Sequence, residues 1–247
     1  MTKTNSQKHD KHALKIVGHR GARALAPENT LASVRKALEY GVDEIEIDIR
    51  ISKDRVAIVH HDREIQDATT ARYDIRQYTY AELLEHKPDL ARLEEIVEAV
   101  DRKVPLQIEI KPGEPTLPVI KILQVYLSQG WHESNFLIGS KSQSTLMEAH
   151  HALPAIPKVV IEPFSGVRAG FRARQLGTKR ISMRSWWLWG FFIRSVSRRG
   201  YQLYAYTINN PDKARRWAAY GLAGIITDYP NRFQRATIKP RSSKTKK

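Results

Sequence analysis

The chain of 247 residues contains no cysteine, which excludes disulfide bonds and thiolate metal sites and fits a reducing compartment. It also has no apolar run near the ~20 residues that a membrane-spanning helix needs. Its longest strongly apolar cluster covers only residues 186–193. Residues 1–14 are polar and lack the apolar core of a secretory signal. These absences predict a cytoplasmic protein.

Acidic residues are scarce in the second half of the chain. Residues 1–124 hold 20 Lys/Arg and 21 Asp/Glu, whereas residues 125–247 hold 21 Lys/Arg and only 5 Asp/Glu. The formal net charge of +15 therefore belongs to the second half. Such a charge attracts anionic partners, including phosphates, acidic lipids and nucleic acid.

The two ends of the chain differ in composition from its middle. Residues 1–14 are polar, and residues 237–247 are basic and rich in Ser and Lys. We expect both ends to be disordered, because neither holds enough apolar surface to form a core. The stretch between them, residues 15–236, is long enough for a single domain with a full core.

Short apolar runs alternate with segments of helical spacing through this domain. A run at 56–60 follows the one at 44–50 too closely for a parallel crossover, so these two predict an antiparallel hairpin. Residues 63–80 show no period and are expected to be irregular. Eight strands with intervening helices predict a (β/α)₈ TIM barrel, with a small β-hairpin and loop insertion after the second barrel strand. The eight strands begin near residues 15, 44, 105, 135, 158, 179, 201 and 224.

Ionisable side chains gather where four of the apolar runs end. In a barrel of this kind, groups at the carboxyl ends of the strands form the catalytic face. Charged groups at such positions are costly unless they meet one another or a ligand. We therefore expect one site, made by His19, Arg20, Glu46, Asp48, His61, Glu109 and Lys111.

These motifs together resemble the glycerophosphodiester phosphodiesterase family, a branch of the barrel-fold phosphodiesterases. The resemblance covers about residues 15 to 233, with the motifs in order. The chain departs from the family at Ala68-Thr69-Thr70, where an Arg is usual, and at Tyr206, where Trp is more usual. The insertion between His61 and Glu109 is also short. The matching pieces are His19-Arg20-Gly21, Pro27-Glu28-Asn29-Thr30, Glu46-Ile47-Asp48, His61-Asp62, Glu109-Ile110-Lys111, Tyr206-Thr207-Ile208-Asn209 and the segment 224–230.

The resemblance implies metal-dependent hydrolysis of glycerophosphodiesters to an alcohol and sn-glycerol 3-phosphate. It implies Glu46, Asp48 and Glu109 as ligands of one divalent cation, either Mg²⁺ or Ca²⁺, with Mn²⁺ as a further candidate. It also implies an acid–base pair, His19 and His61, and two phosphate-binding residues, Arg20 and Lys111. Direct attack by water and a route through a cyclic phosphate both remain open.

Three further residues near these motifs have weaker cases. His60 should point away from the site, because side chains alternate along a strand. Glu162 ends a strand and is a minor candidate for the pocket wall. Asp228 is interpreted as a residue that fixes a loop.

An aromatic stretch, residues 185–192, follows the sixth barrel strand and contains Trp186, Trp187 and Trp189. Nine Lys and Arg surround it, and residues 165–200 contain no acid. Helix packing against the barrel is one interpretation. The other is peripheral contact with an anionic membrane, because Trp favours the headgroup level and cations favour acidic lipid.

These features fit three functions. The first is the phosphodiesterase activity on glycerophosphodiesters, and the second is lysophospholipase D-type hydrolysis of lysophospholipids at a membrane surface, which the aromatic stretch favours. The third is a non-catalytic protein that binds anions or nucleic acid. It ranks low, because it leaves the His and carboxylate set without a purpose, and no specific nucleic-acid motif is present.

Overall fold

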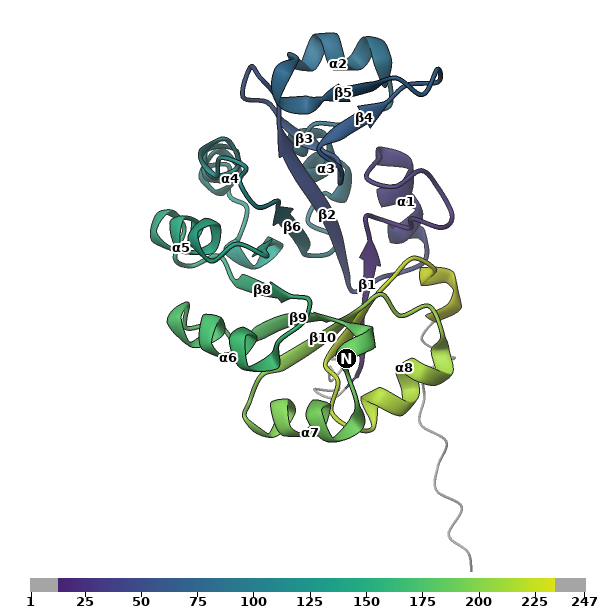
Figure 1. The fold of residues 1–247 in the computed structure, drawn as a ribbon, viewed down its shortest axis with the longest axis vertical. Coiled ribbons are helices and arrows are strands. Elements are labelled where there is room, and N and C mark those ends of the chain that lie inside the picture. The colour runs from purple at the N-terminus through teal and green to yellow at the C-terminus, as the bar shows by residue number, and fades with distance from the viewer. Residues whose placement is uncertain (1–12, 234–247) are drawn as a thin grey trace, which may run out of the picture.

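Eight parallel strands close into a barrel in the computed structural model, which describes residues 13–233 (Figure 1). Pairing of β1 with both β2 and β11 closes the ring. The predicted (β/α)₈ barrel is therefore confirmed, and every strand begins within one residue of its expected position. The strands are β1 (Lys15–His19), β2 (Glu44–Ile51), β6 (Leu106–Ile110), β7 (Phe136–Ser140), β8 (Lys158–Glu162), β9 (Arg180–Arg184), β10 (Gln202–Tyr206) and β11 (Gly224–Thr227).

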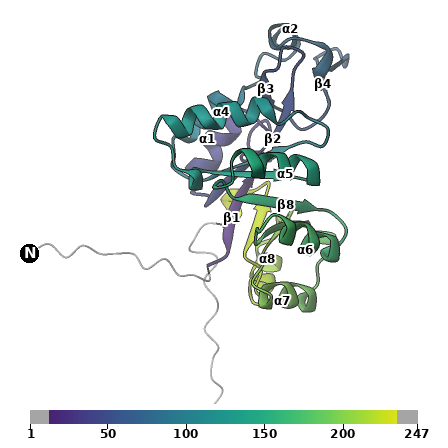
Figure 2. The same cartoon turned by 90° about the vertical axis from the view of Figure 1, so that its left-hand side faces the viewer.

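Helices surround the barrel and cover the outer faces of its strands (Figures 1 and 2). Several begin at side chains that accept hydrogen bonds from the first backbone N–H groups, namely Thr30, Ser142, Ser165 and Asn210. Among residues 13–233, no helix has both the length and the apolar character needed to cross a bilayer. The helices are α1 (Leu31–Glu39), α3 (Leu93–Val100), α4 (Leu117–Ser128), α5 (Gln143–Ala152), α6 (Gly166–Gln175), α7 (Gly190–Arg198) and α8 (Pro211–Ala218), with 3₁₀ turns η2 (Glu133–Asn135), η3 (Ser185–Trp187) and η4 (Pro230–Phe233).

The insertion after β2 forms a small lobe beside the barrel (Figure 1). The predicted hairpin is confirmed, since β3 (Ala57–Val59) pairs antiparallel with β2. The expectation of an irregular segment over residues 63–80 is wrong, because β4 (Glu64–Gln66) and β5 (Arg72–Asp74) pair there and η1 (Ile75–Gln77) follows. Three-residue strands are too short to show a period in the sequence. With α2 (Tyr80–His86), the lobe packs its own small core of Ile58, Ile65, Ile75, Leu83 and Leu90.

Alternation along β2 divides its side chains between two environments. Ile45, Ile47 and Ile49 are fully buried in the main core, whereas Glu46 and Asp48 line the pocket at the mouth of the barrel. The face of β2 that Glu46 and Asp48 share is thus polar, and it presents both carboxylates to the pocket.

The terminal predictions fall mainly outside the described part of the chain. Residues 1–12 and 234–247 are not described, so the expected disorder of residues 1–12 and 237–247 stays a prediction. The expectation is wrong at residue 14, because Leu14 is buried in the main core.

Candidate active site

A tight turn after β1 presents His19 and Arg20 to the mouth of the barrel. Arg20 has a φ of +51° and Gly21 a φ of +82°, so the chain reverses within two residues. A Cβ on Gly21 would lie 2.5 Å from the backbone of Ser33, and one on Gly18 would lie 2.6 Å from the carbonyl oxygen of Gly21. Gly21 is therefore required by the close approach of this turn to α1, and Gly18 by the tightness of the turn itself.

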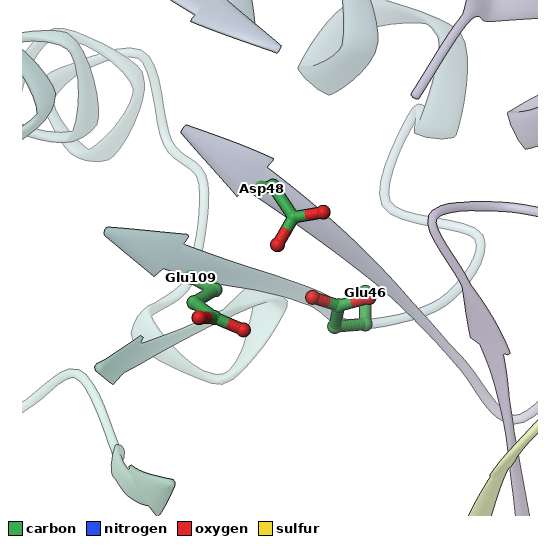
Figure 3. Close-up of side chains that lie close together, drawn as sticks. All are labelled: Glu46, Asp48 and Glu109. Carbon is green, nitrogen blue, oxygen red and sulfur yellow. The ribbon is translucent and has the colours of Figure 1, made fainter. Parts of the chain in front are cut away.

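Three buried carboxylates lie close together, as Figure 3 shows. Glu46 accepts a hydrogen bond at 3.1 Å from the backbone N–H of Arg20 in this turn. Glu46 and Asp48 come from β2, and Glu109 comes from β6, where it stands directly beside Asp48 in the ladder. One oxygen of each lies within 4.8 Å of the others. Burial and the charges of Asp48 and Glu109 raise the pKa of Glu46 well above its ordinary value. A cluster of hard oxygen donors that repel one another in this way fits a divalent cation of the Mg²⁺ or Ca²⁺ type.

Cationic side chains surround the carboxylates. The Nζ of Lys111 contacts Asp48 and lies 2.8 Å from Glu109, and the Nε of Arg20 lies 3.1 Å from Asp48. Burial alone would raise the pKa of Asp48, but the charges of Lys111 and Arg20 outweigh it and lower that pKa. Lys141, which the sequence does not indicate, lies 3.1 Å from Glu109.

The two predicted catalytic histidines each contact a carboxylate through Nδ1. His19 lies 2.6 Å from Asp228, and His61 lies 2.6 Å from Asp62. An ionised carboxylate requires the proton on Nδ1, which leaves Nε2 of each ring for proton exchange. Burial and the charge of Lys111 lower the pKa of His61, so its neutral form is favoured.

One pocket of about 420 Å³ brings all seven predicted site residues together. It lies at the carboxyl ends of the strands, as the barrel fold requires. Its cations outnumber its three carboxylates, so the pocket suits an anionic ligand. The further residues that line it are Arg23, Gln107, Lys141, Ile161, Ser182, Arg184, Trp186, Tyr206, Thr207 and Ile226.

Two supporting residues have partners that the sequence does not indicate. Asn29 is a candidate helix cap by its position, but Thr30 caps α1. The amide of Asn29 instead donates to Asp48 at 3.0 Å and accepts from the backbone N–H of Asp48 at 3.2 Å. Asp228, interpreted from the sequence as fixing a loop, also contacts His19. Both residues lie within the motifs, but their partners are distant in sequence and no local pattern reveals them.

Two of the three residues with weaker cases, His60 and Glu162, do not line the pocket. The Nε2 of His60 lies 3.2 Å from the carbonyl oxygen of Glu64, in the inserted lobe. Glu162 is buried and ion-paired with Arg168 and Arg172. It therefore has a structural partner on α6 and does not face the site.

Comparison with known proteins identifies relatives of this chain. The model of the "Glycerophosphoryl diester phosphodiesterase family" matches residues 19–232. YhdW of Bacillus subtilis, which carries a provisional glycerophosphodiester phosphodiesterase name, is 28% identical over 87% of this chain and 95% of its own. The lysophospholipase D GDPD1 of Homo sapiens is 23% identical over 94% of this chain and 89% of its own. A phosphodiesterase of Oleispira antarctica, solved with the product sn-glycerol-3-phosphate, is 25% identical with a TM-score of 0.81, covering 91% and 96% of the two chains.

Proposed function

The chain belongs to the glycerophosphoryl diester phosphodiesterase family, and we propose that it hydrolyses glycerophosphodiesters to an alcohol and sn-glycerol 3-phosphate. The observation that carries this proposal is the single pocket that holds three carboxylates, two carboxylate-bound histidines and a ring of cations. The product in the similar phosphodiesterase of Oleispira antarctica supports the choice of substrate.

The carboxylates and the cationic side chains contribute in different ways to binding a phosphodiester anion. Glu46, Asp48 and Glu109 would bind one divalent cation, which supplies positive charge toward a phosphoryl oxygen when it is bound. Arg20 and Lys111 add fixed positive charge beside them. Arg20 is held in place by Glu28, whose carboxylate lies 2.6 Å from Nη1. The phosphate thus meets charges whose positions are set before it binds.

The histidines move the protons of the reaction. We assign His61 as the base, because burial and the charge of Lys111 lower its pKa and favour its neutral form. It takes the proton of the attacking hydroxyl, which belongs either to water or to the neighbouring carbon of the glycerol. In the second case the attack closes a cyclic phosphate, which water then opens to sn-glycerol 3-phosphate. His19, held by Asp228, gives a proton to the leaving alcohol oxygen as its bond to phosphorus breaks.

The test is product analysis with the full chain. Glycerophosphocholine is incubated with the enzyme and Mg²⁺, Ca²⁺ or Mn²⁺, and the products are separated. We expect choline and sn-glycerol 3-phosphate in equal amounts. Glycerol with phosphocholine would show that the wrong ester bond is assigned, and no cleavage of any glycerophosphodiester with any of the three ions would overturn the proposal.

A second candidate substrate is a lysophospholipid, which keeps one acyl chain. Trp186 lines the pocket while 87% of its surface is exposed, so an apolar side chain borders the entrance. The human relative named lysophospholipase D supports this candidate. Comparison of kcat/KM for lysophosphatidylcholine and glycerophosphocholine distinguishes the two. The cytoplasmic location, with peripheral contact to membranes, remains a proposal from the sequence.

A non-catalytic role in binding anions or nucleic acid ranks below both substrates. The acidic cluster of Glu46, Asp48 and Glu109 lies in the pocket. Its negative charges would repel a bound polyanion, so a protein that only binds polyanions would bind them more tightly without this cluster. Removal of metal separates these cases: an enzyme with this metal site loses turnover, whereas a basic binder retains its ligand.

A further inference from the structure

Exposed apolar side chains are concentrated in one part of the surface. Seven of the nine large exposed hydrophobic residues between residues 13 and 233 fall within residues 164–191, and the other two, Leu117 and Val125, lie on α4. Such a concentration marks an interaction surface, whereas isolated exposed apolar residues need no explanation. We name it the aromatic rim: Phe164, Val167, Phe171, Trp186, Trp187, Trp189 and Phe191.

The aromatic rim comes from two neighbouring segments that pack together. The ring centroids of Phe164, after β8, and Trp187, after β9, are 6.3 Å apart. A Cβ on Gly166 at the start of α6 would lie 2.4 Å from the ring of Phe192 on α7, so the beginnings of the two helices touch. Both views show α6 and α7 side by side (Figures 1 and 2). The two segments that carry the aromatic rim therefore meet in one region of the molecule.

The aromatic rim is continuous with the entrance of the catalytic pocket. Both of its segments follow the carboxyl ends of barrel strands, which is the catalytic face. Trp186 belongs to the aromatic rim and also lines the pocket. Arg184, immediately before η3, lines the pocket as well. A surface bound to this region would lie directly beside the reacting phosphate.

The charge around the aromatic rim is positive. Arg184 and Arg194 are exposed there, and residues 163–211 contain no acid. The preceding acid, Glu162, is buried and paired with Arg168. The cationic region is smaller than the sequence indicates, because Arg172 and Arg180 are buried inside the fold, with partners such as Glu162 and Glu44. Trp side chains at this exposure beside Arg suit the headgroup region of an acidic bilayer.

We propose that the aromatic rim docks the mouth of the barrel onto an anionic phospholipid surface and thereby admits lysophospholipids whose acyl chain remains in the bilayer. The docking stands on the exposed aromatics and their charge, and the substrate part rests on the proposed phosphodiesterase function. Of the two substrate candidates, docking favours the lysophospholipid whenever it is presented in a membrane.

The first experiment measures sedimentation of the full chain with vesicles of phosphatidylcholine alone or mixed with phosphatidylglycerol, at low and high salt. The test variant is Trp187→Ala/Trp189→Ala/Phe191→Ala, which leaves the pocket lining intact. The matched control is Leu117→Ala/Val125→Ala on α4, and thermal unfolding verifies each fold. We expect binding to phosphatidylglycerol vesicles to weaken by about tenfold or more in the test variant and to be unchanged in the control.

A second variant keeps the proposal testable if the triple variant unfolds. Val167→Glu/Phe191→Glu changes two side chains that are 86% and 79% exposed, so it adds charge without opening the core. It should also weaken binding to phosphatidylglycerol vesicles by about tenfold or more. No binding of wild type to phosphatidylglycerol vesicles at low salt, or equal binding by wild type and both variants, would overturn the proposal.

Activity separates failure of docking from failure of the proposed function. The triple variant should hydrolyse soluble glycerophosphocholine like wild type, while its turnover of lysophosphatidylcholine in phosphatidylglycerol vesicles falls about tenfold or more, in step with binding. Wild type that cleaves glycerophosphocholine but binds no vesicles contradicts docking alone. Wild type that binds vesicles through the aromatic rim but cleaves neither substrate contradicts the phosphodiesterase function and the substrate part, and leaves the docking supported.

Discussion

The smallest unit of this site is a side chain together with the group that holds it. Asp48 is held by the amide of Asn29, His19 by Asp228, and Arg20 by Glu28. Supporting hydrogen bonds of this kind fix the orientation of catalytic groups and are costly to remove. The roles of Asp48, His19 and Arg20 therefore depend on pairings between motifs that the sequence alone does not indicate.

The two histidines of the pocket should be far more sensitive to substitution than their neighbour in sequence. We expect His19→Ala and His61→Ala each to lower kcat by about 10²–10⁴-fold, the usual contribution of a positioned acid or base. His60→Ala is the matched control and should cost little, because its ring faces the carbonyl oxygen of Glu64. Steady-state kinetics on glycerophosphocholine measures all three. An essential His60 with a dispensable His61 would contradict the assignment.

The carboxylates should respond to loss of charge without loss of fold. Glu46→Gln, Asp48→Asn and Glu109→Gln each remove one charge from the proposed cation site, and we expect turnover to fall by about 100-fold or more. Circular dichroism should remain that of wild type. Calorimetric titration with Mg²⁺ or Ca²⁺ reports affinity directly, and unchanged affinity and turnover in all three variants would exclude this cluster as the metal site.

At the level of elements, two adjacent residues at the start of α1 have different roles: one stabilises the helix and the other supports the site. Thr30 caps the helix, whereas Asn29, at a φ of +58°, reaches across to β2. The sequence places two polar residues side by side here, but it does not show which of the two side chains turns inward. Only the packing of α1 against the barrel decides this.

A pair of substitutions at this helix start tests that division. Thr30→Ala should lower the free energy of unfolding by about 1 kcal/mol with nearly unchanged kcat. Asn29→Gly, which tolerates the positive φ, should instead weaken metal affinity by about 10–100-fold. Denaturant unfolding and calorimetric metal titration are the two measurements. A Thr30 variant with impaired metal binding and an Asn29 variant without it would reverse the two roles.

The elements of the barrel were predictable because each is long enough to show its period. Runs such as Glu44–Ile51 alternate acids with isoleucines, so both the strand and the face of Glu46 and Asp48 follow from the sequence. The inserted lobe was only partly predictable: its hairpin follows from a short connection, but β4 and β5 are three residues each. Lys141 and Asp228 join the site through contacts between strands that are neighbours in the barrel but far apart in the sequence, and no local pattern contains such contacts.

For the whole molecule, the cation site couples metal binding to protonation. In the metal-free protein the pKa of Glu46 is raised above its ordinary 4.5, so the folded chain retains a proton that the unfolded chain loses. Stability from this group is therefore present below pH 4.5 and is lost as pH rises through the raised pKa. The pKa of Asp48 is lowered, so its contribution to folding stability is present above pH 3.8 and is lost as pH falls below that value.

A pH series checks this coupling. Because a bound cation displaces the proton of Glu46, metal affinity should increase as pH rises above 4.5 and level off once Glu46 is ionised. At about 100 times the dissociation constant, metal should add about 2.7 kcal/mol to the free energy of unfolding. Thermal unfolding with and without Mg²⁺ across this range provides the measurement, with Glu46→Gln as the control. A metal effect of equal size at every pH would contradict the coupling.

Turnover of glycerophosphocholine by the chelator-treated chain, measured as metal is returned, tests the central claim most directly. We predict that the stripped enzyme remains folded but releases no sn-glycerol 3-phosphate, and that Mg²⁺, Ca²⁺ or Mn²⁺ restores release along a saturation curve. The same titration of Asp48→Asn should restore little. Undiminished release by the stripped, metal-free enzyme would contradict a reaction that depends on a cation held by Glu46, Asp48 and Glu109.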